Sequence, residues 1–314
     1  MPAGYEVRPP TSEDIDAIAA VLLADDLADA GQPVLDADFV REQWSRGGFE
    51  PATDGWVVLD DDGTIVAYGH VATDEPGIVE SWGVVHPAHR GRGIGAALFG
   101  LIEDRAGRLT DPPPQRFRHA ANAGDRPAGA LMTSRGLRTV RHFWHMQIDP
   151  EAPFDAGPAP DGVAIDGIDP AVDLPAIHAI LVEAFADDWG YHPEPFDRWA
   201  EDYANGPSYD PTLWLLARDD GKPVGALTAN TFGDRGWVGE LGVVTSHRGR
   251  GIGAALLRRS FAMFVDRGFG HVLLNVDAEN PTGATALYER VGMRIVKRWD
   301  LWERSAEDDA THRH

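Results

Sequence analysis

The hydrophobic and polar positions along the chain repeat one order of elements twice. Apolar residues three and four positions apart are typical of helices, and strict alternation of apolar and polar residues is typical of strands. In the first half these patterns predict strands over 5–8, 55–59, 65–72, 78–85, 117–121 and 137–148, with helices over 12–27, 36–46 and 126–135.

The second half follows the same order. The pattern predicts helices over 170–186, 195–203 and 282–290, and strands over 163–168, 212–217, 223–230, 237–244, 271–276 and 293–302. A further helix begins near Ile252, and Gly268 is its expected C-terminal cap. Asp219, Asp220 and Gly221 predict a hairpin turn between two of the strands. Both halves are therefore mixed α/β.

The segment between the halves differs in composition. Residues 149–162, DPEAPFDAGPAPDG, are rich in Pro, Gly and acidic residues and have no apolar periodicity, so we interpret them as a linker. The sequence then predicts an N-terminal domain over 1–148 and a C-terminal domain over 163–304. The polar residues 305–314 are expected to form a flexible tail.

Composition narrows the class of protein. With 43% apolar residues, 10 Trp and 12 Phe, each half can bury a core of its own. No apolar stretch is long enough to span a membrane, and residues 1–10 lack the pattern of a signal peptide, so we expect a soluble, cytoplasmic protein with no membrane partner. The absence of cysteine excludes disulfides and a cysteine nucleophile, and the 12 His residues show no metal-ligand spacing.

The formal net charge of −22 argues against a nucleic-acid partner, because phosphate backbones are bound by dense Lys and Arg. An acidic field favours cationic small molecules or peptides. A surface that is merely well solvated explains the same charge.

The ten residues HRGRGIGAAL occur at His89–Leu98 and again at His247–Leu256. Each copy follows a predicted strand and opens a predicted helix, an arrangement that presents free backbone N–H groups and the positive end of the helix dipole to an anion. The glycines let the backbone approach a phosphate closely, and the arginines add charge. This pattern predicts a ligand that carries a diphosphate.

Two other phosphate-binding loops are weighed against this sequence. A P-loop requires Lys followed by Ser or Thr, and neither copy has it. Gly249, Gly251 and Ala254 satisfy the loose dinucleotide pattern, and Asp277 ends the next predicted strand, where a ribose-binding acid would lie. A dinucleotide fold begins with this turn and needs several βα units after it, whereas too few residues for these units follow Gly253. A nicotinamide-dependent oxidoreductase is therefore the weaker alternative.

The pattern R-x-x-G-x-G after a strand, at Arg90–Gly95 and Arg248–Gly253, resembles the acetyl-CoA diphosphate loop of the GNAT superfamily of N-acyltransferases. The stretch LNVDAENPTGATALYERVGM, Leu274–Met293, resembles a second segment of that family. The resemblance implies an α/β (α+β) fold of two tandem GNAT domains, each a mixed, mostly antiparallel sheet with flanking helices and a splayed central strand pair. It also implies acetyl-CoA, or another acyl-CoA, as the cofactor.

The resemblance assigns a coenzyme-binding role to residues of both halves. These are Gly242, Val243, Val244, Arg248, Gly249, Arg250, Gly251, Ile252, Gly253, Ala254 and Asn280 in the second half, and Val84, Val85, Arg90, Gly91, Arg92, Gly93, Ile94, Gly95 and Ala96 in the first. The interval from Asn280 to the following tyrosine is one residue longer than is common in the family.

Transfer of an acyl group from a thioester to an amine needs a base for the incoming ammonium and a proton for the departing thiolate. Glu240, on the strand before the loop, is the expected base, acting through water, although a strand carboxylate can also simply face solvent. By the family resemblance, Tyr288 lies near the thioester sulfur and is the expected proton donor. An aromatic residue packed beneath the coenzyme is the alternative role for Tyr288.

The acceptor side is expected in the stretch FADDWGYHPEPF, Phe185–Phe196. The candidate substrate-binding residues are Asp187, Asp188, Trp189, His192 and, from the strand beyond the loop, Asn275. Some of these side chains can equally well be packing or solvated groups. The acceptor is expected to be a small-molecule or peptide amine, and the protein a monomer or a homodimer.

The first half keeps the loop and a strand carboxylate, Glu80, but the position of Tyr288 falls on Met132 and that of Asn280 near Gly124. Methionine cannot donate a proton. We therefore expect the first domain to bind the cofactor without efficient turnover and the second to be catalytic. A non-catalytic acyl-CoA-binding sensor or scaffold is the alternative from another class of function.

Overall fold

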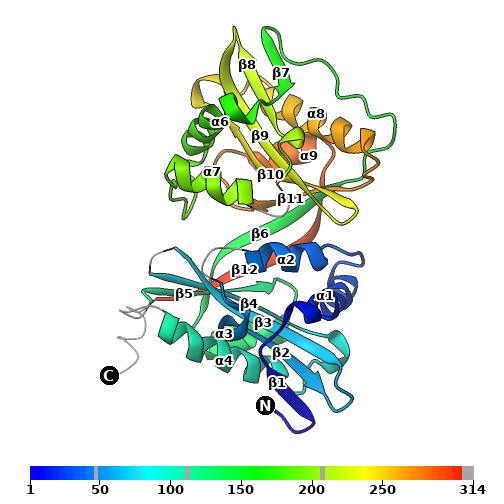
Figure 1. Cartoon of the computed structure of the whole chain (residues 1–314), viewed down its shortest axis with the longest axis vertical. Coiled ribbons are helices and arrows are strands. Elements are labelled where there is room, and N and C mark those ends of the chain that lie inside the picture. Colours follow the sequence, from blue (N-terminus) through cyan, green and yellow to red (C-terminus); the bar gives the residue numbers. More distant parts are fainter. Residues whose placement is uncertain (46–48, 76, 110–113, 206–208, 306–314) are drawn as a thin grey trace. The chain divides into compact units, whose positions relative to one another are not determined.

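The computed structural model describes residues 1–45, 49–75, 77–109, 114–205 and 209–305. It divides into two compact units (Figure 1). The first unit comprises Met1–Phe143 and Lys297–His314, and the second comprises Trp144–Val296. The predicted tail, apart from Ser305, lies outside the described residues.

The elements of the first unit follow the predicted order. They are β1 (Tyr5–Arg8), α1 (Ile15–Asp29), α2 (Ala37–Ser45), α3 (Pro51–Asp54), β2 (Gly55–Asp60), β3 (Ile65–Glu75), β4 (Ile78–Val85), α4 (Ile94–Leu109), β5 (Arg116–Asn122) and α5 (Arg126–Ser134), with 3-10 turns at Ser12–Asp14 and Pro87–His89. The strands β6 (Arg138–Ile148) and β12 (Arg294–Ser305) each contribute to both units.

The elements of the second unit repeat this order. They are β7 (Val163–Gly167), α6 (Pro170–Phe185), α7 (Phe196–Asn205), β8 (Leu215–Asp219), β9 (Lys222–Phe232), β10 (Arg235–Val243), α8 (Ile252–Asp266), β11 (Val272–Asp277) and α9 (Ala284–Arg290), with 3-10 turns at Pro211–Leu213 and Thr245–His247. The predicted turn joins β8 to β9, and Asp220 and Gly221 both have positive φ there, as a type I′ hairpin requires.

The sheets of the two units have matching pairings. In the first unit β1 to β4 are antiparallel neighbours, β5 lies parallel to β4, and β12 lies antiparallel to β5. In the second unit β7 to β10 are antiparallel and β11 is parallel to β10. The parallel pairs separate at their C-terminal ends. β4 is paired with β5 only as far as Trp82, opposite Ala120, although β4 itself continues to Val85. The predicted mixed sheet with a splayed central strand pair is confirmed.

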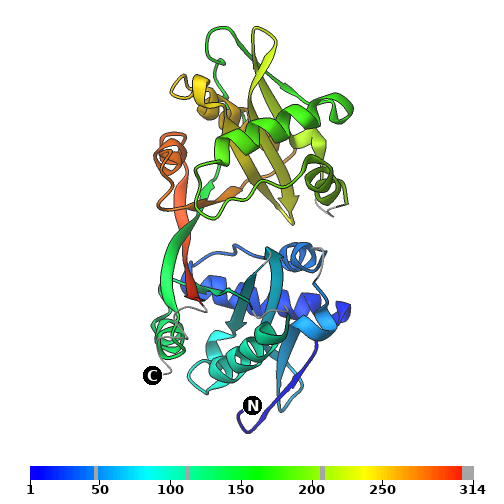
Figure 2. The ribbon, with the colours of Figure 1, turned by 90° about the vertical axis from the view of Figure 1, so that its left-hand side faces the viewer.

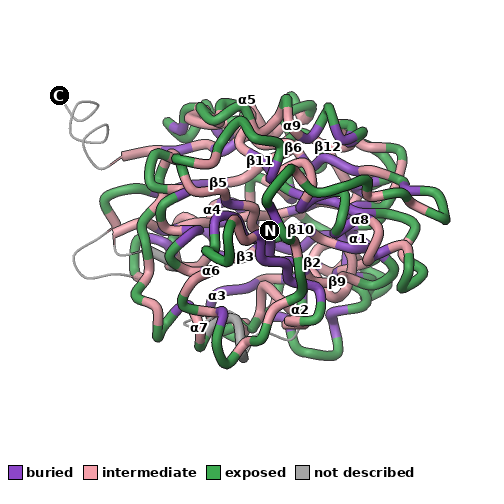
Figure 3. The backbone as a smooth tube through the Cα atoms, turned by 90° about the horizontal axis from the view of Figure 1, so that it is seen from above, coloured by how far each residue is buried: buried purple, intermediate pink, exposed green. Residues whose placement is uncertain are grey.

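Helices cover both faces of each sheet, and Figure 2 shows α6 lying across β9 and β10. Gly242 faces α6, because a Cβ built there would lie 2.9 Å from Ala184 Cβ. Gly225 faces α8, where its Cβ would lie 3.1 Å from Ile252 Cγ2. The core between these layers contains buried residues such as Phe261, and burying one such side chain stabilises the fold by about 1.5–3 kcal/mol. Figure 3 colours the buried parts of the chain purple.

The last strand of each half joins the sheet of the other half, at least in part. β12, at the end of the chain, completes the sheet of the first unit next to β5, while Trp144–Ile148 of β6 belong to the second unit and β6 is a neighbour of β11. The proposed boundaries at 148 and 163 follow chain order and therefore differ from the boundaries of the compact units. Gly-rich and strand patterns define elements, but they do not say which sheet a strand joins.

Residues 149–162 contain no helix or strand, as their composition indicates. They belong to the second unit, where Asp149 contacts His271 at 2.8 Å and Arg294 at 2.8 Å, and Phe154 packs edge-on against Phe261. In the part of the chain that the structure describes, no helix has the length and apolar character needed to cross a membrane.

Candidate active site

The two copies of the repeated sequence adopt the same backbone. Gly93 and Gly251 both have φ of +84°, a left-handed conformation that favours glycine, immediately before α4 and α8. The first helical hydrogen bonds come from Ala97 N–H to Gly93 O and from Ala255 N–H to Gly251 O. The amides that precede these donors therefore point out of each helix end, where an anion can accept from them.

In the first unit the loop forms one wall of a cavity of about 260 Å³. Eight of the nine residues predicted to bind coenzyme there line it, namely Val84, Val85, Arg90, Gly91, Gly93, Ile94, Gly95 and Ala96. Arg92, the ninth, extends instead to Tyr5 Oη at 3.0 Å and Ala88 O at 3.1 Å. The cavity lies where β4 and β5 separate, and its other lining residues include Trp82, His119 and Met132.

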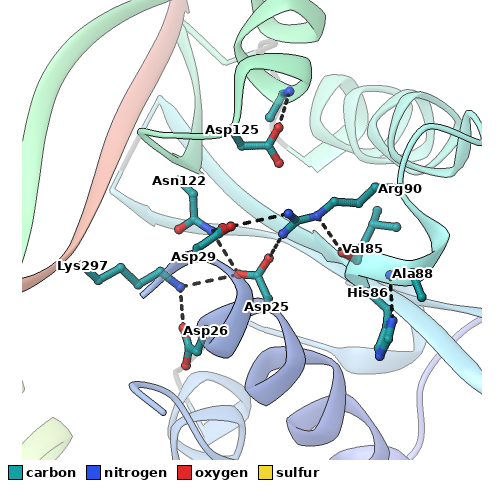
Figure 4. A network of polar contacts seen from close by, with 11 residues as sticks. Asp25, Asp26, Asp29, Val85, His86, Ala88, Arg90, Asn122, Asp125 and Lys297 are labelled. Atoms are coloured by element: carbon teal, nitrogen blue, oxygen red, sulfur yellow. Dashed lines mark hydrogen bonds and ion pairs between the residues drawn. The ribbon is translucent and has the colours of Figure 1, made fainter. Parts of the chain in front are cut away.

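Figure 4 shows the polar network that fixes Arg90 at the edge of this cavity. Its guanidinium forms ion pairs with Asp25 and, at 3.5 Å, with Asp29, and its Nε donates to Val85 O at 3.4 Å. Asn122 Nδ2 donates to the same two carboxylates at 3.0 and 2.6 Å. Burial alone would lower the pKa of Arg90, but Asp25 and Asp29 outweigh it and hold that pKa above its ordinary value.

A buried lysine completes the network. Lys297 of β12 places Nζ 2.6 Å from Asp26 and 3.6 Å from Asp25. Burial raises the pKa of Asp25, and the positive charges of Lys297 and Arg90 oppose that rise. The first loop therefore has its leading arginine neutralised by neighbouring carboxylates.

The second loop is held differently. Arg248 donates to two main-chain carbonyls, Val243 O at 3.2 Å and Ala184 O at 2.9 Å. The other arginine of the loop, Arg250, is the one that pairs with a carboxylate, Asp219, at 2.6 Å. The two loops have identical sequences, but the arginine that pairs with carboxylates is Arg90 in the first loop and Arg250 in the second.

Glu240 lies in a β-bulge of β10. The register with β9 shifts between Val238 and Leu241, and Thr228 Oγ1 accepts a hydrogen bond from Glu240 N–H at 2.9 Å. Bulges are frequent beside active sites because they redirect a side chain. Glu240 lies near Tyr191, whose pKa is raised by burial and by the negative charges of Glu240 and Glu194.

Tyr288 is buried on α9 and lies near Asp188, which belongs to the predicted acceptor stretch Phe185–Phe196. Burial, followed by the negative charge of Asp188, raises the pKa of Tyr288 to about 12. Asp188 Oδ2 accepts from Asn280 Nδ2 at 3.2 Å, and Asp188 Oδ1 is buried with no hydrogen-bond partner among the described residues. Burial and Asp277 raise the pKa of Asp188, and Arg248 opposes them. Tyr288, Asp188, Asn280 and Arg248 therefore form one cluster.

The ends of α5 and α9 align the two units residue by residue. Met132 O accepts from Leu137 N–H, and Tyr288 O accepts from Met293 N–H, each at 3.0 Å. The predicted correspondence of Met132 with Tyr288 is confirmed. Trp82 of β4 corresponds to Glu240 of β10, because each lies three residues before the last residue of its strand, Val85 or Val243. At Trp82 the register between β3 and β4 is regular, so β4 has no bulge there. Glu80 is paired with Arg118 at 3.3 Å.

The predicted acceptor residues have unequal positions. Asp188 is joined to Asn280, whereas Asp187, His192 and Asn275 are exposed and Trp189 is half-buried. Sequence reasoning missed Tyr191 and Thr228. Tyr191 falls inside the predicted acceptor stretch, but the importance of Thr228 depends on strand register, which the sequence does not display.

Two parallel strands that separate beside a helix-opening loop of free amides, repeated in two units, define the GNAT class of N-acyltransferases. The model of the acetyltransferase (GNAT) family matches residues 21–145 and again 174–293. The chain therefore belongs to this family, and it is an N-acetyltransferase.

Individual relatives are similar to most of the chain. A mycothiol acetyltransferase from Thermobispora bispora is 31% identical over 312 residues, covering 96% of this chain and 98% of that protein. Another, from Salinispora arenicola, is 35% identical over 253 residues, 76% of each chain. The crystal structure of a GCN5-related N-acetyltransferase from Sphaerobacter thermophilus has a TM-score of 0.82 at 33% identity, covering 97% of this chain and 96% of that one.

A tandem GNAT protein from the clavulanic acid biosynthesis pathway has a TM-score of 0.72 at 18% identity, covering 96% of this chain and 98% of that chain. At this identity the likeness concerns the fold alone.

Proposed function

We propose that the second unit catalyses transfer of the acetyl group of acetyl-CoA to the amine of a small molecule or peptide. The observation that carries this proposal is the presence of Glu240 and Tyr288 beside one loop, at positions where the other unit has Trp82 and Met132. A base and a proton donor are the two groups that direct transfer to an amine needs.

The coenzyme is proposed to bind at the start of α8. The amides of Gly249–Ala254 and the guanidinium of Arg248 bind the diphosphate, and Asn280 borders the same site. At the end of β10 that runs beyond its pairing with β11, the backbone N–H of Val243, next to Gly242, polarises the thioester carbonyl. The N–H of Val244, predicted for the same role, is not available because it donates to Val224 O at 3.0 Å. Acetyl-CoA supplies the activated acyl group.

Glu240 is proposed to accept a proton, through water, from the acceptor ammonium, which frees the nitrogen lone pair to attack the carbonyl carbon. As the new C–N bond forms and the C–S bond breaks, Tyr288 Oη donates its proton to the departing sulfur, and the second proton lost by the nitrogen passes through water to the tyrosinate and restores it. A tyrosine with a pKa near 12 is fully protonated at neutral pH, so the donor is present in every molecule.

Asp188 is proposed to attract the amine. Its buried Oδ1 lacks a hydrogen-bond partner among the described residues, and its pKa is raised by burial, so a cationic group bound beside it is favoured. Asp187, Trp189, His192 and Asn275 are proposed as the outer boundary of this acceptor site. The relatives named mycothiol acetyltransferase support a small-molecule acceptor.

The first unit is proposed to bind an acyl-CoA without turning it over. Its cavity lies at the corresponding loop, but Met132 cannot donate a proton and Trp82 cannot accept one.

The decisive experiment is incubation of the whole chain with acetyl-CoA and a panel of primary amines, with release of free thiol as the readout. We expect thiol release that depends on one class of amine and on Tyr288. Binding of acetyl-CoA without thiol release for any amine would support a sensor or scaffold instead. Binding of a nicotinamide nucleotide in place of acetyl-CoA would support the oxidoreductase alternative.

A further inference from the structure

His119 is the polar side chain at the inner end of the cavity in the first unit. The pairing of β4 with β5 ends at Trp82 and Ala120, so His119, one residue earlier on β5, lies at the end opposite the loop. Its surroundings in the cavity are apolar and include Leu98, Phe99, Ile102 and Met132. A diphosphate held at the loop therefore directs the far end of the coenzyme toward His119.

Hydrogen bonds fix which nitrogen of His119 carries the proton. Ser81 Oγ lies 2.8 Å from Arg118 O, a carbonyl that can only accept, so the single hydroxyl hydrogen of Ser81 is donated there. His119 Nδ1, also 2.8 Å from Ser81 Oγ, must then be the donor of that contact. Nε2 is left with a lone pair, and no other described residue forms a hydrogen bond with it.

His119 is also uncharged. Burial, and after it the charge of nearby His70, lowers the pKa of His119 to about 3, so the ring is neutral at physiological pH. The ring meets Phe99 edge-on, with centroids 4.9 Å apart, which limits its rotation. The inner end of the cavity thus presents one fixed hydrogen-bond acceptor in an apolar wall.

We infer that the first unit selects a coenzyme A derivative whose terminal group carries a hydrogen-bond donor, and that His119 Nε2 accepts this hydrogen bond. The free thiol of coenzyme A and the hydroxyl of a hydroxyacyl thioester share this chemistry. An acetyl group offers only a carbonyl oxygen and a methyl group, neither of which can satisfy a buried acceptor. The inference rests on the proposed binding of coenzyme A by the first unit.

The test uses the full chain with Gly251→Trp, which blocks the second loop and leaves the first available. Isothermal titration would compare four ligands: coenzyme A, its analogue with a methyl group in place of the thiol, acetyl-CoA and hydroxyacetyl-CoA. We expect coenzyme A to bind at least about fivefold more tightly than the methyl analogue and acetyl-CoA, as one neutral hydrogen bond allows. Tight binding of hydroxyacetyl-CoA instead would identify the hydroxyl as the donor.

Two further substitutions locate the effect. His119→Phe should make the affinities for coenzyme A and its methyl analogue equal, while His119→Gln, whose amide can still present an acceptor, should keep part of the difference. If His119→Phe fails to fold, the comparison of coenzyme A with the methyl analogue on intact His119 still decides. Equal affinities there overturn the inference and leave coenzyme binding standing. No binding of any of the four ligands would refute the proposed function of the first unit as well.

Discussion

The two units contain the same ten residues, HRGRGIGAAL, with the same backbone, yet their surroundings differ at each position where chemistry occurs. The second unit places a bulged strand with Glu240 and a buried Tyr288 beside the loop, whereas the first has a regular strand with Trp82 and a methionine. Duplication thus preserves the loop more strictly than the groups that surround it. The loop alone is not sufficient to identify an active site.

The first arginine of each loop, Arg90 or Arg248, also has different partners in the two units. Arg90 is bound by Asp25 and Asp29, and Arg248 by the carbonyls of Val243 and Ala184. Arg248 lies near Asp188, but its hydrogen bonds go to carbonyls, so its positive charge is offset less than that of Arg90 and attracts a phosphate more strongly.

The largest expected effect comes from blocking one loop at a time. Gly251→Trp places a bulky residue at φ of +84° and fills the space in front of the helix end, so turnover should fall on the order of 100-fold or more. The matched variant Gly93→Trp, at the same φ, should leave turnover within about threefold and mainly lower stability or coenzyme affinity. Steady-state assays of both variants measure the contrast. Loss of turnover in Gly93→Trp alone would reverse the assignment of the active unit.

Removing the proton donor should have the next largest effect. Tyr288→Phe keeps the buried ring but not the hydroxyl, so kcat should fall on the order of tenfold or more while acetyl-CoA affinity stays near wild type. Met132→Phe is the control at the equivalent position of α5, and it should leave kcat unchanged. Wild-type turnover by Tyr288→Phe would rule out the proton-donor role.

The bulge of β10 can be tested through Thr228, which acts by positioning Glu240. Thr228→Val removes the acceptor of the Glu240 N–H bond, and kcat should fall by about three- to tenfold, as expected for one buried hydrogen bond. Thr228→Ser retains the hydroxyl and should restore kcat. If both variants lose the same activity, packing at this position, rather than the hydrogen bond to the bulge, is responsible.

The smallest effect concerns stability in acid. The Arg8 guanidinium, bonded at 2.7 Å, lowers the pKa of Asp14 to about 2 in the folded protein. This contribution is complete above the unfolded pKa near 3.9 and is lost as pH falls through about 2. Because Arg8 is partly exposed, Asp14→Asn should lower the free energy of unfolding at pH 7 by only about 1 kcal/mol.

Urea titrations of wild type and Asp14→Asn should therefore differ at pH 7 and converge near pH 2. Asp173→Asn is the matched variant in the second unit, since Asp173, in the first turn of α6, accepts a hydrogen bond from Asp169 N–H at 2.9 Å and pairs with Arg218 at 2.7 Å. A difference between wild type and Asp14→Asn that persists unchanged at pH 2 would contradict the electrostatic origin of the effect.

The local features of the fold could be predicted from the sequence. The strand over 78–85 agrees residue for residue, and the helix after the second loop ends where Gly268 adopts a left-handed φ, because these elements are fixed by periodicity and glycine chemistry. The repeated helix pattern also predicts that Tyr288 and Met132 occupy equivalent positions, and both carbonyls accept the same type of hydrogen bond at the helix end.

Long-range features could not be predicted. Lys297 and Asp26 are separated by 271 positions, and no local pattern indicates that they meet. The bulge at Glu240 depends on pairing with Thr228 of a neighbouring strand. The sequence of one strand does not show that it contains an additional residue, because this is defined only by the register with its partner. For the same reason chain order alone predicts that β12 belongs to the second domain, whereas most of β12 belongs to the first unit.

The position of β12 has a consequence for biosynthesis. A ribosome that has completed the first half of the chain has not yet made residues 297–305, so the edge of β5 that pairs with β12 stays open until these residues have been translated. A gene fragment that ends at residue 148 would encode this open edge permanently. Attempts to express the two halves separately should therefore yield aggregation-prone products, and a circular permutant whose chain begins with β12 is a better starting point because that strand is then made before β5.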